Sequence, residues 1–385
     1  MTPLRAQTPT PEGEIVFWHH YADETRADFW QTMADEFNAA HPENMPVRAE
    51  FFPSYDHQHD AILSALLNGN PPDVAFVQNY HARLYQLSDA LVDLSPLLME
   101  ADMRDEQYLG FPLTRSATAL YVNMDALTAY GLDDAPVTRA DFALATCAFH
   151  EGRGWGDVRL VAPPGFDFPR DASFLMALGP HEIVEDDAFD FDTDHWHNTF
   201  NFLLDLQSRG CMSTHITTRA EMQNRFASGQ TLFYIDSSSA RPFVEAAIAD
   251  YFAEPFALEV LPIPSDLSGP VSLWSGPSLS IFRSSPEKEA AVWEWVRWLA
   301  QPEQVARWAE VNHAFPTRND VDYSPEYEPF VNAEWMGEPN FAGYDLIRDE
   351  IIFAALDIFA GESPSARLQS LTETANQIKD AFQSP

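Results

Sequence analysis

Residues 273–319 read LWSGPSLSIFRSSPEKEAAVWEWVRWLAQPEQVARWAEVNHAFPTRN and decide the fold of this chain. The turn at Gly276-Pro277 leads into a short apolar strand, residues 279–282. Ser285 then supplies a helix N-cap, and Pro286 suits the first helical position. Apolar residues recur in the helix at the spacing of one buried face: Val292, Trp295, Val296 and Leu299. A second helix restarts at Gln301-Pro302. A strand and helices this apolar need an existing sheet to cover, so we interpret the stretch as a return to a domain begun earlier.

That earlier domain is indicated by three short apolar segments, EIVFW (14–18), PVRAEFF (46–52) and DVAFV (73–77), each followed by a helical pattern. Alternating strands and helices predict right-handed βαβ units and a parallel sheet. Ligands of such sheets bind outside the carboxyl ends of the strands. The residues expected along that rim are His19, His20, Tyr21, Tyr55, Asp56, Gln78, Asn79 and Tyr80.

The remaining segments predict a second domain and several crossings. Residues 110–123 form an extended segment with Arg115 and Ser116 at its crossing point, and two acidic helices end the chain. We predict an α/β protein of two lobes, made of residues 14–115 with 275–320 and residues 116–274 with 321–385. Residues 1–13 are rich in Thr and Pro and are expected to be a disordered spacer. Such a spacer would follow a removed signal segment, although a cytosolic protein would look the same.

Composition excludes several classes of partner. The 385 residues carry 59 acidic and 22 basic side chains, for a net charge of −37. This field repels nucleic acid and anionic membrane surfaces, and no apolar run reaches membrane-spanning length. The two cysteines, Cys147 and Cys211, permit one disulfide, but we expect two buried thiols.

Sequence motifs for catalysis or metal binding are missing. There is no GxSxG, phosphate loop or HExxH, and carboxylates are too abundant for a glycosidase pair to be singled out. The histidines at 19–20, 57–59 and 195–197 lack the spacing of a zinc site and are interpreted as polar surface. We therefore expect no enzymatic activity, no metal and no cofactor.

Six segments, taken in order, carry a resemblance to a known family. They are EIVFWHHY (14–21), NGNPPDVAFVQ (68–78), GFPLTRSATALYVNMDAL (110–127), FASGQTLFYIDSS (226–238), the segment from SGPSLSIF (275–282) through the helices after it, and HAFPTRNDV (313–321). Together they resemble the extracellular solute-binding proteins of ABC importers, in the branch that contains the maltose and glycerol-3-phosphate binding proteins. The resemblance implies a two-lobed flytrap fold (type II periplasmic binding protein) that closes on a sugar and docks on permease subunits.

The resemblance also assigns positions in the site. It places the family's ligand-contacting aromatic at Tyr55. After the third strand, where the glycerol-3-phosphate branch has an acidic residue, this chain has Asn79. The resemblance matches Ser116, the serine-rich turn at 237–239 and the crossing glycine Gly276. Two departures disfavour glycerophosphate. Ala314 replaces the tyrosine of the family's Gly-Tyr-Leu-Pro motif, and residues 343–345 offer no match for a late arginine.

The predicted function is capture of a neutral sugar, oligosaccharide or polyol in the cleft between lobes. Sugars offer C–H faces to aromatic rings and hydroxyls to planar polar groups. The candidate ligand contacts are His20, Tyr21, Tyr55, Asp56, Asn79, Tyr80, Arg115, Ser116, Phe166, Asp236, Ser237, Trp274, Gly276, Tyr344 and Asp345.

The expected partners are a small carbohydrate and ABC permease subunits, with no nucleic acid, and the protein is expected to be a monomer. We expect it in the periplasm or outside the cell, with a lipid anchor left open. Arg115 is equally suited to anchoring a carboxylate at the hinge. The alternatives are a glycerophosphodiester, phosphate-ester or metal binder of the same fold, and a secreted carbohydrate-active enzyme.

Overall fold

The order of strands in the first sheet follows the alternation of apolar and helical segments along the chain. The structure, a computed structural model, describes residues 13–21, 23–100, 109–153, 169–178, 183–185, 188–212, 218–265 and 270–383. Unit 1 comprises Met1–Arg115, Gly276–Tyr323 and Asn340–Ala342, and unit 2 comprises Ser116–Ser275, Ser324–Pro339 and Gly343–Pro385. The chain therefore passes between the units several times. That these two units act as lobes that hinge about a ligand remains a prediction.

Unit 1 is built on a four-stranded sheet in the order β10-β3-β1-β2. Strand β1 is parallel to both β2 and β3, as predicted, whereas the returning strand β10 is antiparallel to β3. The elements of this unit are β1 (Ile15–His19), α1 (Glu24–Ala40), β2 (Val47–Phe51), α2 (Tyr55–Leu67), β3 (Val74–Val77), α3 (Asn79–Leu87), α4 (Ser95–Glu100), β10 (Ser278–Ile281), α11 (Pro286–Leu299), α12 (Pro302–Asn312) and β11 (Phe315–Pro316).

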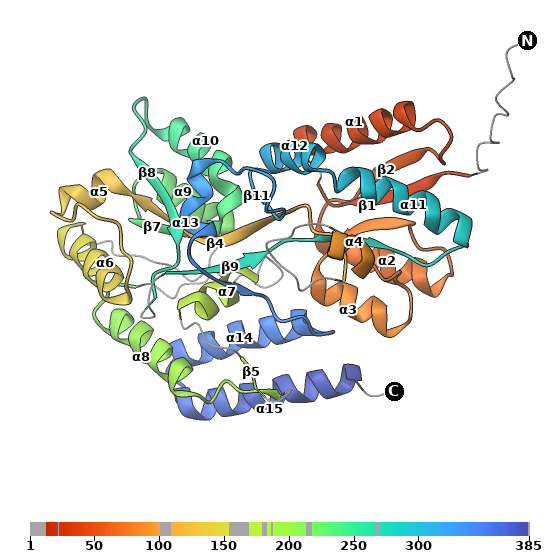
Figure 1. The fold of residues 1–385 in the computed structure, drawn as a ribbon. Coiled ribbons are helices and arrows are strands. Elements are labelled where there is room, and N and C mark those ends of the chain that lie inside the picture. Colours follow the sequence, from red (N-terminus) through yellow and green to blue (C-terminus); the bar gives the residue numbers. More distant parts are fainter. Residues whose placement is uncertain are drawn as a thin grey trace, which may run out of the picture. The chain divides into compact units, whose positions relative to one another are not determined.

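Helices cover both faces of this sheet (Figure 1). Val74 and Phe76 of β3 face the core formed with α1, α11 and α12, where Trp295 and Trp308 are buried. Ala75 and Val77 point to the opposite face and pack with α2 and α3. The predicted start of α11 is confirmed, because Ser285 Oγ accepts from Lys288 N and Pro286 is the first helical residue.

Unit 2 is organised around the long strand β4 (Thr114–Asn123), whose first two residues belong to unit 1 and pair with β11. Both β7 and β8 are antiparallel to its second half, and β9 pairs with it at Ser116 and Ala117. The other elements are α5 (Met124–Ala129), α6 (Arg139–Arg153), α7 (Pro169–Leu178), β5 (Val184–Glu185), β6 (Ala188–Phe189), α8 (Asp194–Ser208), α9 (Arg219–Ala227), β7 (Phe233–Ser237), α10 (Arg241–Tyr251), β8 (Leu258–Pro262), β9 (Val271–Ser275), α13 (Glu328–Val331), β12 (Glu334–Gly337), α14 (Tyr344–Phe359) and α15 (Pro364–Gln383), with short 3-10 turns at Ser238–Ala240 and Pro325–Tyr327.

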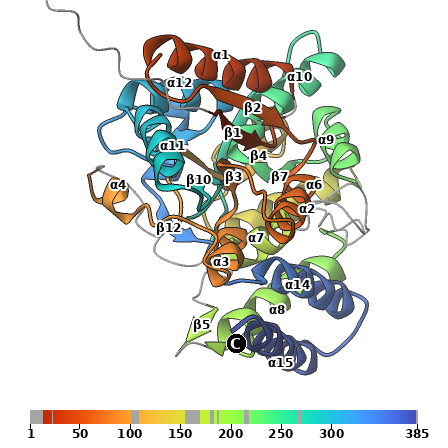
Figure 2. The ribbon, with the colours of Figure 1, turned by 90° about the vertical axis from the view of Figure 1, so that its right-hand side faces the viewer.

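The two carboxyl-terminal helices pack inside unit 2, where the sequence placed them. Figure 2 shows α14 and α15 side by side, with α8 next to them. Helix α7 contacts both β9 and α14 within this unit. None of the helices in the described ranges combines the length and apolar character needed to cross a membrane.

The prediction of two unpaired thiols is wrong. Cys147 in α6 and Cys211 after α8 form a disulfide, so the described residues contain no unpaired cysteine. The bond links positions separated by 64 residues and ties α6 to the end of α8. The sequence offered two apolar contexts for the cysteines but no evidence that the fold brings them together.

Removing this disulfide should destabilise unit 2. A cross-link that closes a loop of this length restricts the unfolded chain and is expected to contribute about 4 kcal/mol to the free energy of unfolding. We expect the double variant Cys147→Ser/Cys211→Ser to unfold at a lower urea concentration than the parent protein. Dithiothreitol should shift the parent to the same midpoint and leave the variant unchanged. Equal midpoints for the oxidised parent and the variant would contradict this expectation.

Candidate functional site

The exit loops of β1, β2 and β3 meet at one edge of the unit 1 sheet. Parallel pairing places Trp18 beside Glu50 and His19 beside Phe51, so β1 and β2 end at the same level. Strand β3 runs parallel to β1 on its other side and ends at Val77. The side chains after these strands therefore share the edge where α/β sheets bind their ligands.

A cluster of three rings forms the centre of this edge. The His20 ring stacks on the Tyr55 ring at 3.6 Å, centroid to centroid, with an interplanar angle of 28°, and makes a tilted contact with the Tyr21 ring at 4.1 Å. His20 and Tyr21 are buried, whereas Tyr55 is 39% exposed. Tyr55 is the first residue of α2, which Ser54 caps by accepting from His57 N. The helix start thus fixes the aromatic ring that covers the imidazole.

Burial keeps this edge uncharged. Loss of hydration lowers the pKa of His20 well below its usual value, and the neighbouring His19 and Arg26 act in the same direction. Burial likewise lowers the pKa of His19 to about 4, opposed by a backbone hydrogen bond at Tyr21. Burial raises the pKa of the Tyr21 hydroxyl well above its usual value. Both imidazoles and this phenol are therefore neutral near pH 7.

The third exit loop is connected to the first residues of the returning strand. Ser278 Oγ donates to Asn79 Oδ1 at 3.3 Å and accepts from Arg115 Nη2 at 2.9 Å. Arg115 Nη1 also donates to the carbonyl oxygen of Pro277 at 3.0 Å. Gly276 has φ +144°, and a Cβ there would lie 3.5 Å from the Thr114 carbonyl oxygen. The predicted residues Asn79, Arg115 and Gly276 are thus brought together by Ser278.

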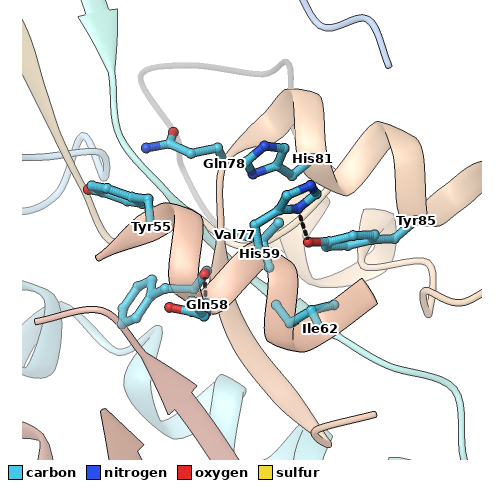
Figure 3. A pocket seen from close by; sticks show the side chains of 9 residues that line it. Tyr55, Gln58, His59, Ile62, Val77, Gln78, His81 and Tyr85 are labelled. Atoms are coloured by element: carbon cyan, nitrogen blue, oxygen red, sulfur yellow. Dashed lines mark hydrogen bonds between the residues drawn. The ribbon is translucent and has the colours of Figure 1, made fainter. Parts of the chain in front are cut away.

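A small cavity lies behind the Tyr55 ring, between α2, β3 and α3 (Figure 3). His59 and His81 stack face to face inside it at 3.7 Å, and His59 Nδ1 is hydrogen-bonded to Tyr85 OH at 2.6 Å. The cavity measures about 10 Å³, room for roughly one water molecule. A solute does not fit there. Its lining residues are Tyr55, Gln58, His59, Ile62, Phe76, Val77, Gln78, His81 and Tyr85.

In unit 2, Asp236 anchors the predicted serine-rich turn at residues 237–239. Asp236 is 1% exposed, and its carboxylate accepts from Arg219 Nε at 2.9 Å, Tyr234 OH at 2.5 Å and Ser237 N at 2.6 Å. These bonds hold the turn in place. Ser237 remains partly exposed, and so does Ser116 on the adjacent strand β4. Those two serines, rather than Asp236, keep surface available to a ligand.

Two of the predicted aromatic residues of unit 2, Trp274 and Tyr344, are buried. Trp274 is 4% exposed inside β9, where its indole N–H donates to Ser272 Oγ at 3.0 Å. Its ring stacks on Trp335 of β12, which is 39% exposed. Tyr344 is fully buried and donates to Met176 Sδ at 3.0 Å. The assumption that turn residues leave Trp274 exposed does not fit this strand, although a place in the ligand site remains a prediction for both residues.

The remaining predicted contacts are less informative. Asp56 is exposed in the first turn of α2, Asp345 is half-buried in the first turn of α14, and Tyr80 is 7% exposed in α3. Phe166 lies outside the described residues. Sequence reasoning missed Ser278 and Gln58, because both occur in segments that read as strand or helix surface. In the part of the chain that the structure describes, no cluster of three or more His, Cys, Asp or Glu side chains could hold a metal ion.

Comparison with known proteins identifies the family. The sequence model of the bacterial extracellular solute-binding proteins matches residues 32–334, well over half of the chain. None of the curated proteins matches the chain.

Solved structures show the same fold over nearly the whole chain. The cyclic alpha-maltosyl-1,6-maltose binding protein of Arthrobacter globiformis matches with a TM-score of 0.81 and 19% identity, over 96% of this chain and 99% of that one. The sugar-binding protein MalE of Xanthomonas citri matches with 0.79 and 18%, over 96% and 98%. UgpB of Mycobacterium tuberculosis, solved with glycerophosphocholine, matches with 0.76 and 16%, over 97% and 100%. The predicted two-lobed periplasmic-binding-protein fold is thereby confirmed.

Acid should destabilise unit 1 through its buried histidines. The pKa of His19 is about 4 in the folded protein against about 6.5 when unfolded, so between these values the unfolded chain binds more protons. The stability is complete above about pH 6.5 and falls as the pH drops, by about 3 kcal/mol at pH 4 for this residue. Urea unfolding of the parent and of His19→Phe at pH 7 and pH 4 measures the effect, since shared carboxylate contributions cancel. Identical pH dependence in the two proteins would contradict it.

Proposed function

Because the chain belongs to the bacterial extracellular solute-binding proteins, we propose that it binds a neutral sugar, oligosaccharide or polyol and delivers it unchanged to the permease subunits of an ABC importer. The observation that carries the proposal is the chemistry of the strand-end edge in unit 1. Aromatic rings and uncharged imidazole and amide groups gather there, which are the groups that bind sugar C–H faces and hydroxyls.

The pairing of one buried arginine in each unit also favours an uncharged ligand. Arg115 in unit 1 donates to the carbonyl oxygens of Thr114 and Pro277 and to Ser278. In unit 2, Arg348 of α14 is 4% exposed and pairs with Glu338 at 3.6 Å. A phosphate would have to compete with these partners for either guanidinium.

A second candidate is a glycerophosphodiester, because the fold matches UgpB as well as the sugar-binding proteins. It differs from the first candidate in the charge that the site must compensate. Buried anions need paired cations or several hydrogen-bond donors. The neutral imidazoles at the edge supply no charge, which places this candidate second.

The disulfide supports action outside the cytoplasm. Disulfides persist in oxidising compartments such as the periplasm and the extracellular space. The bond between Cys147 and Cys211 therefore agrees with a periplasmic or extracellular location. We further propose that the protein acts as a monomer, free or lipid-anchored, and that it has no catalytic activity of its own.

A thermal-shift panel tests the proposal. A ligand that binds only the folded protein raises the unfolding midpoint, by about 2.7 kcal/mol of stability at a concentration 100 times its Kd. We expect a shift with at least one neutral sugar or polyol among glucose, maltose, trehalose, cyclic maltosyl-maltose and sorbitol, and none with glycerophosphocholine or glycerol 3-phosphate.

The same mixtures, analysed by mass spectrometry after prolonged incubation, should contain the sugars unchanged. A shift with the phosphate compounds alone would reverse the order of the two candidates. Cleaved oligosaccharide would show that the protein is an enzyme.

A further inference from the structure

Several buried polar atoms at the strand-end edge form no hydrogen bond of normal geometry among the described residues. Besides Nδ1 of His19, they include Nδ1 and Nε2 of His20 and Oε1 of Gln58. Their side chains are more than nine-tenths buried, with exposed fractions of 8% for His20 and 2% for Gln58. Buried polar groups in folded proteins are nearly always paired, because an unpaired one loses its hydration without compensation. Two such residues in one place therefore call for a functional explanation.

The surrounding contacts keep these atoms from finding partners within the protein. Gln58 Nε2 donates to the carbonyl oxygen of Phe76 at 2.7 Å, which fixes the carboxamide and leaves its oxygen unused (Figure 3). The His20 ring stacks on Tyr55 and makes a tilted contact with Tyr21, and neither ring face can replace hydrogen bonds to the imidazole edge. The side chain of Gln58 acts on the His20 pKa as a hydrogen-bond partner, raising it against the larger effect of burial, but the contact does not reach the geometry of a full hydrogen bond.

The chemistry of these atoms defines what would satisfy them. A neutral imidazole offers one donor and one acceptor, and the Gln58 oxygen is a second acceptor. A hydroxyl both donates and accepts, so a pair of hydroxyl groups complements the set. A phosphate oxygen only accepts and would leave the two acceptors unpaired. Burial keeps the His20 pKa low and the ring neutral, which agrees with this assignment.

Access to His20 depends on one side chain. The Tyr55 ring stacks directly on the imidazole and is itself 39% exposed. It belongs to the first residue of α2, at the boundary between loop and helix.

We propose that His20 and Gln58 form a hydroxyl-binding subsite in unit 1, covered by Tyr55 until a sugar displaces or restacks the ring. The inference rests on the proposed function and deepens it. The subsite makes His20 a specificity-determining residue for the hydroxyl groups of the ligand.

The test separates affinity from stability in one variant. His20→Phe keeps an aromatic ring in the stack but removes both unpaired nitrogens. We expect its thermal midpoint to equal or exceed that of the parent protein. Its affinity for maltose, glucose and sorbitol, measured by isothermal calorimetry with each sugar that binds the parent, should fall about 10- to 100-fold. A purely structural histidine would give a lower midpoint or unchanged affinity.

Two further variants make the result specific. Phe17→Leu alters the packing beneath the edge, where the buried Phe17 ring contacts His19, Trp30 and Phe76, and should leave affinity unchanged. His20→Gln retains a donor and an acceptor and should keep affinity within a few-fold of the parent, about 5-fold at most. If His20→Phe does not fold, His20→Leu replaces it in the same comparison.

The outcomes distinguish the inference from the proposed function. Sugar binding by the parent with equal affinity in His20→Phe would overturn the subsite and leave the sugar-binding function standing. Equal losses in Phe17→Leu and His20→Phe would also overturn it, since the effect would then come from the packing. Binding of glycerophosphocholine with no sugar bound by the parent would overturn both.

Discussion

The antiparallel pairing of β10 with β3 is the constraint on which unit 1 depends. It joins Ser278 to Val77 and Ile281 to Val74, two segments that lie far apart in the sequence. The pairing gives β3 a second neighbour and brings α11 and α12 over the sheet, where Trp295 and Trp308 complete the core with α1. Closing so long a loop costs chain entropy, and burial of these large apolar side chains offsets that cost.

The same pairing positions polar groups at the sheet edge. Because Ser278 begins β10 opposite the end of β3, it lies between Asn79 and Arg115 and bonds to both. The parallel ends of β1 and β2 meanwhile bring His20 under Tyr55. The core thus fixes neutral imidazole, amide and hydroxyl groups at the sheet edge, while the Arg115 guanidinium is held by backbone carbonyls and Ser278. This is the physical basis for selecting a polyhydroxylated solute.

Local patterns in the sequence were sufficient for the sheet of unit 1. The caps, the apolar stripes and the alternation of strands and helices predicted β1, β2, β3, β10 and their helices. The strand ends also predicted the edge at which the rings of His20 and Tyr55 stack. Those features depend on neighbouring residues, so the sequence expresses them directly. The resemblance to solute-binding proteins added the family, which the comparison confirmed.

Features that depend on tertiary contacts could not be predicted in this way. The Cys147–Cys211 bond requires α6 and α8 to lie together, and no local pattern reports that. Trp274 precedes turn residues in the sequence, but β12 pairs with β9 and covers its ring with Trp335. Asp236 looked available to a ligand, yet Arg219 and Tyr234 bind its carboxylate. Burial and pairing, rather than residue type, decide these cases.

The central claim is that uncharged polar groups left unpaired at the strand ends of unit 1 bind the solute. It is tested most directly by nitrogen-15 NMR of the His20 side chain at neutral pH, before and after adding a sugar that raises the unfolding midpoint. The account predicts a neutral imidazole in both states, with both ring-nitrogen resonances shifted by the sugar. A protonated imidazole, or nitrogen resonances that stay in place while the sugar is bound, would contradict it.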